Sequence, residues 1–200
     1  MVTKSSISEL HLRLRSATKQ PHKALDHHPL LAPLVARDLS VLQYGDALAA
    51  LHGIYSGAED WIIAFLDQAP DLFDYRSRRK LSALEFDLSK LGRSVVLPRL
   101  VFAAPQAVGA LIGVLYVIEG STQGGQFIAR ALQKSHGENL PSQFFAGYGE
   151  RSSQHWQAFL EFADTHCPIG EYDLATTTAV SLFDAIKRHL DEAYFLEQPR

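Results

Sequence analysis

Several features that define large classes of proteins are scarce or missing in this 200-residue sequence. It has a single cysteine, Cys167, which excludes an internal disulfide framework and suits a reducing compartment. No apolar run reaches 18 residues without a charge, and the N-terminal residues lack the apolar region of a signal peptide. The net charge of −3 and the pI near 6.3 give no indication of a nucleic-acid-binding surface. We therefore expect a soluble, cytoplasmic protein with no membrane span and no nucleic-acid partner.

The motifs of common cofactor and metal sites are also missing. No Gly-x-Gly-x-x-Gly follows a strand pattern, so the sequence predicts no flavin or nicotinamide site of its own. No cluster of His, Cys or carboxylate residues has the spacing of a zinc site. His52 is accompanied by Glu59 and Asp60 but by no Glu-x-x-His motif, so a di-iron carboxylate bundle is unsupported.

Alternation of apolar and polar residues, the mark of a half-buried strand, is almost absent, and Val95-Val96 is too short to count. Helical spacing of apolar residues is present throughout, which predicts an all-α fold. A hydrophobic content of 46% in 200 residues is enough for one core, so we expect a single domain over 1–200 with flexible ends at 1–7 and 197–200.

Caps and breakers predict six helices. A capping box at Ser6-x-x-Glu9 opens the first, and Pro21 should kink it or restart it near His22. Ser40-x-x-Gln43 opens the second helix. This second helix should end near Gln68, and the four later helices are expected at 74–92, 108–132, 152–166 and 173–196. A connector is expected at 28–37. The segment 135–149 should be an aromatic loop that carries Phe144, Phe145 and Tyr148.

The predicted helix 108–132 contains five glycines, at 109, 113, 120, 124 and 125. Each internal glycine destabilises a helix by roughly 1 kcal/mol relative to alanine. Gly113, Gly120 and Gly124 share one face, where bare backbone would admit either a neighbouring helix or a flat ligand. The spacing fits both readings equally well. Two adjacent glycines after Gly-Ser-Thr-Gln further predict a bend in this helix.

His22 is the strongest candidate ligand among nine histidines. Asp26 follows one turn later, where it can accept a hydrogen bond from the second ring nitrogen and fix the tautomer. Arg15 lies two turns earlier, about 10 Å along the axis, and a guanidinium is suited to pairing with carboxylates. Tyr116, one turn before Gly120, carries a hydroxyl that could reach a carboxylate of a bound ligand.

The stretches Leu14-Arg-Ser-Ala-Thr-Lys-Gln-Pro-His22 and Tyr116-Val-Ile-Glu-Gly-Ser-Thr-Gln-Gly-Gly-Gln126 together resemble the heme oxygenase family. The sequence is most similar to the bacterial branch that includes phytochrome-associated enzymes. The resemblance spans nearly the whole chain and implies a multi-helix bundle whose glycine-rich distal helix is kinked.

Carried over residue by residue, the resemblance implies that His22 is the proximal iron ligand and that Asp26 hydrogen-bonds it. Arg15 and Tyr116 match residues that pair with the heme propionates. The resemblance assigns the distal, catalytic segment to Gly120, Ser121, Thr122 and Gly124. Mammalian members carry an aspartate where this chain has Ser121, so we expect Ser121, Thr122 or Gln123 to organise the distal water instead. No second propionate-binding arginine can be matched late in the chain.

The implied activity is cleavage of heme with O2 and external electrons to biliverdin, CO and ferrous iron. Heme would be substrate and cofactor, a separate reductase or ferredoxin-type protein the electron donor, and a phytochrome a possible acceptor of biliverdin. Two alternatives remain at this point. The first is a non-catalytic heme carrier or sensor on the same scaffold. The second is a helical enzyme for another planar molecule, with the glycines serving only packing.

Overall fold

The computed structural model describes residues 7–94, 98–101 and 107–196. Within these ranges it contains seven α-helices, several 3-10 turns and no strand, which confirms the all-α prediction. The α-helices are α1 (Glu9–Asp26), α2 (Val41–Leu66), α3 (Leu81–Lys90), α4 (Val108–His136), α5 (Gln143–Ala146), α6 (Ser152–His166) and α7 (Tyr172–Leu196). The 3-10 turns are η1 (Ala32–Val35), η2 (Arg76–Arg78), η3 (Gly137–Asn139), η4 (Gly149–Arg151) and η5 (Ile169–Glu171).

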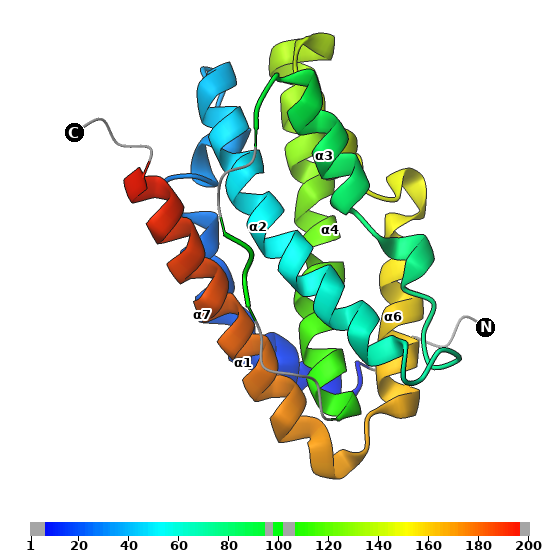
Figure 1. The fold of residues 1–200 in the computed structure, drawn as a ribbon. Coiled ribbons are helices and arrows are strands. Elements are labelled where there is room, and N and C mark those ends of the chain that lie inside the picture. Colours follow the sequence, from blue (N-terminus) through cyan, green and yellow to red (C-terminus); the bar gives the residue numbers. More distant parts are fainter. Residues whose placement is uncertain (1–6, 95–97, 102–106, 197–200) are drawn as a thin grey trace.

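The long helices form a bundle in which α4 is central (Figure 1). α4 packs against α7, α6, α5 and α2, whereas α1 packs mainly along α7. The core is built from aliphatic side chains of all the long helices, with the large rings of Tyr44, Tyr75 and Phe159 fully buried among them. None of the helices of the described chain is both long and apolar enough to cross a membrane.

Two predicted helix starts can be compared with the structure. The capping box at the start of α2 is confirmed, since Ser40 accepts from Gln43 N and the Gln43 side chain accepts from Ser40 N. α1 begins at Glu9, two residues after the start that a cap at Ser6 predicts, and its N-cap is Ser8, whose hydroxyl accepts from His11 N at 3.2 Å. The predicted cap, Ser6, lies outside the described residues.

The first helix does not restart at Pro21, so that half of the prediction is wrong, while the kink stays a prediction. α1 is assigned as one helix from Glu9 to Asp26, with Pro21 inside it. A proline removes one backbone hydrogen bond from a helix, but packing on α7 supports α1 on both sides of this position. Arg13 pairs with Asp173 before it, and the His22 ring contacts Phe183 after it.

The segment 74–92 is not one helix as predicted, because α3 begins only at Leu81. Two cationic side chains of the segment before α3 are buried, with Arg78 and Lys80 only 8% and 4% exposed. The backbone N–H groups of Lys80 and Leu81 donate to the Glu59 carboxylate of α2, at 2.6 and 3.1 Å. A carboxylate from another helix thus satisfies the first N–H groups of α3, and no local sequence signal reveals it.

Candidate functional site

His22 lies on the exposed side of α1. Its Nδ1 is 3.1 Å from Asp26 Oδ2, one turn later, as the spacing predicted. The imidazole lies edge-on to Phe183 of α7, with ring centroids 5.9 Å apart. Because the carboxylate occupies Nδ1, the arrangement favours the tautomer that leaves Nε2 free as a ligand. The side chain is 61% exposed, so Nε2 is accessible from outside the bundle.

Arg15 and Tyr116 approach the same region from two helices. Arg15 is exposed on α1, and no salt bridge to it occurs within the described chain. The hydroxyl of Tyr116, on α4, interacts with Thr18 of α1. Burial raises the pKa of Tyr116, while Thr18 and Arg15 act in the opposite direction. The phenol therefore stays protonated near neutral pH, as a hydrogen-bond donor beside an unpaired guanidinium.

Three of the five glycines of α4 are explained by packing within the chain. A Cβ at Gly113 would overlap the carbonyl of Ala175 on α7, and one at Gly109 would lie 2.8 Å from Glu171. A Cβ at Gly125 would lie 3.1 Å from the carbonyl of Phe145. The packing reading of the glycine face therefore holds for Gly113.

Gly120 and Gly124 are different. A Cβ at Gly124 would meet no atom within 4 Å, and one at Gly120 would meet only the ring edge of Trp156, at 3.6 Å. Both positions have room for alanine, so packing within the chain does not require glycine there. Gly124 is exposed, and α4 is continuous across both positions, so the bend predicted here stays a prediction. A ligand lying directly on the helix backbone would account for the two glycines that the chain itself does not.

An aromatic cluster that the sequence did not predict borders Gly120. Trp156 of α6 lies against Gly120 and is tilted against Tyr116, with ring centroids 5.6 Å apart. His11 of α1 lies edge-on to both rings, at 6.3 and 6.1 Å. Burial lowers the pKa of His11, Arg15 lowers it further, and Asp164 acts in the opposite direction. The cluster joins α1, α4 and α6 at the Arg15 end of the candidate site.

The polar residues after Gly120 differ in their access to solvent. Ser121 is exposed, and its hydroxyl lies 2.6 Å from the hydroxyl of Tyr55 on α2 and 2.7 Å from Ile118 O. Because the single hydroxyl hydrogen of Ser121 is directed to Ile118 O, we assign Tyr55 as the donor to Ser121. Thr122 is buried, and its hydroxyl donates to Glu119 O at 2.6 Å. Of the two hydroxyl groups, that of Ser121 is thus the more accessible to solvent.

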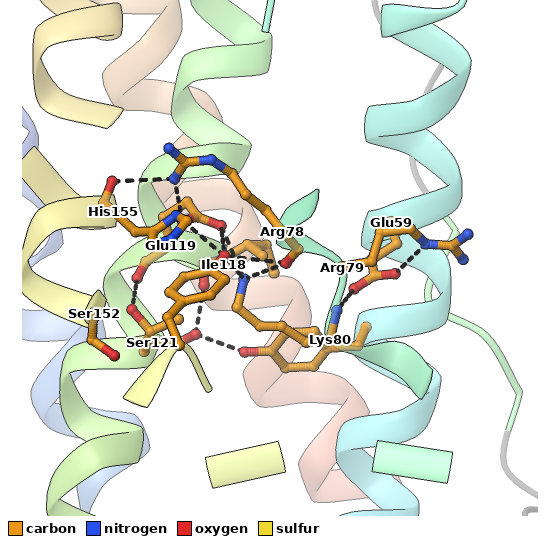
Figure 2. A network of polar contacts seen from close by, with 12 residues as sticks. Glu59, Arg78, Arg79, Lys80, Ile118, Glu119, Ser121, Ser152 and His155 are labelled. Atoms are coloured by element: carbon orange, nitrogen blue, oxygen red, sulfur yellow. Dashed lines mark hydrogen bonds and ion pairs between the residues drawn. The ribbon is translucent and has the colours of Figure 1, made fainter. Parts of the chain in front are cut away.

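Next to Gly120 lies a buried ionic network that the sequence did not predict (Figure 2). Glu119 is 1% exposed and accepts from Arg78 Nη1 at 2.8 Å and from Lys80 Nζ at 2.9 Å. The hydroxyl of Tyr148 lies 2.8 Å from the same carboxylate. The one available signal was Glu119 itself, an acidic residue on an otherwise apolar helix face.

The heme oxygenase family model matches residues 8–167, which include every candidate residue of the site. The chain belongs to the heme oxygenase family. A relative described as heme oxygenase, from Xanthomonas campestris pv. campestris, is 36% identical over 95 residues. That alignment covers 46% of this chain and 53% of the relative, about half of its length.

Solved structures of heme oxygenases share the fold. The Neisseria meningitidis protein, determined with NO and CO bound, aligns with a TM-score of 0.75 at 21% identity and covers 96% of this chain and 94% of its own. The Leptospira interrogans protein aligns at 0.73 and 16% identity, covering 92% of this chain and 100% of its own. Heme oxygenase-1 from Synechocystis, in complex with heme, aligns at 0.70 and 16% identity, with 92% of each chain covered.

Proposed function

We propose that the chain is an active heme oxygenase that converts heme, O2 and external electrons into biliverdin, CO and ferrous iron. The observation that carries the proposal is the unfilled space at Gly120 and Gly124, in a family member whose other glycines in α4 lie close against the rest of the chain. Within the described residues no group of three or more His, Cys, Asp or Glu side chains could hold a metal ion. A tetrapyrrole brings four nitrogen ligands of its own, so a single histidine is enough to hold its iron.

Three residues of α1, together with Tyr116 of α4, fit one face and one edge of such a ligand. His22 offers a free Nε2, and Asp26 holds its ring through Nδ1. Arg15 and the protonated hydroxyl of Tyr116 supply a cation and a neutral donor for carboxylates at the edge. Heme, when bound, supplies the oxygen-activating iron and the carbon atom that is oxidised.

The residues on α4 fit the opposite face. The absence of side chains at Gly120 and Gly124 leaves no acid or base next to the ligand, so proton delivery falls to ordered water. Ser121 is the proposed contact to that water, since its oxygen keeps a lone pair free after bonding Tyr55 and Ile118. Burial raises the pKa of Tyr55, so this phenol remains a donor at every physiological pH.

Two protein partners complete the proposal. A separate reductase or ferredoxin-type protein would supply the electrons, and a phytochrome is an acceptor of biliverdin that the resemblance to phytochrome-associated members suggests. The electron donor is tested by measuring turnover with a candidate reductase or ferredoxin in place of ascorbate.

One aerobic titration with hemin, followed by ascorbate, tests the function. An active enzyme binds hemin stoichiometrically, and its Soret band is then replaced by a biliverdin spectrum. A carrier or sensor would keep a stable Soret band in the presence of reductant and O2. An enzyme for another planar molecule would not bind hemin stoichiometrically.

The ligand assignment is tested by His22→Ala with His27→Ala as the matched control. Both histidines lie at the exposed end of α1, but only His22 is paired with Asp26. We expect the hemin spectrum to change in His22→Ala and to be unchanged in His27→Ala. An unchanged spectrum in His22→Ala would show that another residue binds the iron.

A further inference from the structure

The stretch of α4 between Ile118 and Leu132 buries less apolar side chain than the part of the helix before it. Ile118 and Leu132 are buried, but no large apolar side chain of α4 between them is. Phe127, the largest of these side chains, is 61% exposed. Gly120 and Gly124 contribute no side chain at all. Ile128 and Ala129 are only partly buried against the core. Hydrophobic burial, which is non-directional, therefore does less to fix this stretch of the helix in space than it does before Ile118.

Directed polar contacts do much of the work of hydrophobic burial in this stretch of α4, and Glu119 makes the strongest of these contacts. Both of its carboxylate oxygens are engaged, one by Arg78 Nη1 and the other by Lys80 Nζ, and the Tyr148 hydroxyl lies within hydrogen-bond distance of both, at 2.8 and 3.1 Å. Arg78 Nη1 also donates to His155 O, at 3.1 Å. Buried charge-assisted bonds of this kind are short and geometrically specific. Three further polar contacts come from the same stretch of α4: Ser121 to Tyr55, Gln123 to Ser152 O and Gln126 to Ala146 O.

The segment that carries the two cations of Glu119 is itself held by a second buried carboxylate. Glu59 of α2, with 0% exposure, accepts from the backbone N–H of Lys80 and from Arg79 Nε at 3.0 Å. Figure 2 shows Glu59 and Arg79 beside α2, Glu119, Arg78 and His155 on the side of α6, and Lys80 between them. Burial lowers the pKa of Lys80, and Glu119 opposes that shift. α4 is thus tied to α2 through two carboxylates and the segment 78–80.

We propose that Glu119 is a positioning residue that fixes where the Gly120–Gly124 backbone lies relative to the substrate. This inference rests on the proposed function, in which that backbone forms one wall of the heme site. Glu119 touches no ligand; it acts through the helix, one residue before the first glycine. Its expected effect is on which carbon of the ring meets the distal wall, and therefore on which biliverdin isomer forms.

The tether is tested first on the ligand-free protein, by hydrogen exchange of backbone amides. In Glu119→Gln, amides of 120–126 should exchange at least ~10-fold faster, because their local opening becomes easier. Lys80→Met should do the same. The double variant should add less than the sum of the two single effects, since both remove one interaction. Tyr148→Phe, which deletes one neutral donor and retains the ion pairs, should fold and show a smaller change at the same amides.

His189→Asn is the control for general destabilisation. His189 is buried, and its Nε2 lies 3.0 Å from Ala50 O, so it is also a polar tether between helices, but one that joins α7 to α2. Its loss should speed exchange near residue 50 and leave 120–126 unchanged relative to wild type. If the Glu119 variants and the control speed exchange uniformly along the chain, the tether is ordinary core structure and the proposal is overturned.

The second measurement is the ratio of biliverdin isomers formed by each hemin-loaded variant. We expect the ratio to shift in Glu119→Gln, Lys80→Met and, less so, Tyr148→Phe, and to stay at the wild-type value in His189→Asn. Faster exchange at 120–126 with an unchanged isomer ratio would overturn the positioning role. If the wild type neither binds nor cleaves hemin, the proposed function fails, and with it the positioning role, whereas the exchange result still decides whether the tether exists.

Discussion

Alanine substitutions at Gly113 and Gly124 should have opposite effects, although both glycines lie in the same helix. At Gly124 the new methyl group meets no atom of the protein. Alanine is favoured over glycine in a helix interior by about 0.5–1 kcal/mol, so Gly124→Ala should raise the free energy of unfolding of the ligand-free protein by that amount. For a chain of this length, 1 kcal/mol corresponds to roughly 2–4 °C in Tm. At Gly113 the methyl would overlap the Ala175 carbonyl, and such overpacking typically costs about 1–3 kcal/mol.

Hemin affinity should change in the opposite sense to stability: it should fall in Gly124→Ala and stay at the wild-type value in Gly113→Ala. If heme lies on the backbone at Gly124, the methyl overpacks the ligand instead of the protein. The same ~1–3 kcal/mol then appears as a Kd roughly 5- to 150-fold weaker. Folded Gly113→Ala should bind hemin like wild type, because its strain lies against α7.

The assays are thermal unfolding by circular dichroism without ligand and a spectroscopic hemin titration at a temperature where both variants are folded. The decisive signature is a protein that is more stable and yet binds hemin less well. A Gly124→Ala protein that gains stability and keeps wild-type affinity would refute the argument that the glycine admits the ligand.

Three further outcomes follow from the contacts. Asp26→Asn should weaken hemin binding by about 10- to 100-fold, the usual effect of removing the partner that orients a metal-bound histidine, and the titration above measures it. Ser121→Ala should leave the hemin spectrum unchanged but slow biliverdin formation about 10-fold or more, measured as the rate of Soret loss with ascorbate. An unaffected rate would exclude Ser121 from proton delivery. The free energy of unfolding should fall as pH drops below about 6.5. Burial lowers the pKa of His28 and His189 in the folded state, so the unfolded chain binds protons first. Urea midpoints should therefore decrease from pH 7 to 6 to 5, and they should decrease less steeply in His189→Asn.

The features predicted well from the sequence are those set by local chemistry. The capping box at Ser40 and the bounds of α6 depend on neighbouring residues, and so does the turn from His22 to Asp26. The start of α3 was wrong because a tertiary partner, Glu59, decides it from another helix.

The candidate site shows the same division. Sequence spacing placed Gly113, Gly120 and Gly124 on one face, but it could not say which of them another helix fills. That distinction depends on α7, which provides Ala175 at Gly113 and nothing at Gly124. Tyr55 went unnoticed for a related reason, since it meets Ser121 from a position 66 residues away.

The packing of α1 along α7 has a consequence for the order in which the site can form during synthesis. His22 lies on the first helix of the described chain, yet its aromatic neighbour Phe183 lies on the last, and nearby His28 pairs with Asp191, 163 residues later. A nascent chain that has been translated through α6 already contains the whole glycine-bearing helix but lacks α7, along which α1 mainly packs. The face of α1 that holds His22 is therefore completed only when α7 has been made, and at the proposed site we expect heme binding to follow translation of α7. A chain ended at residue 171 should accordingly fail to bind hemin, although it retains His22, Arg15, Gly120 and Gly124.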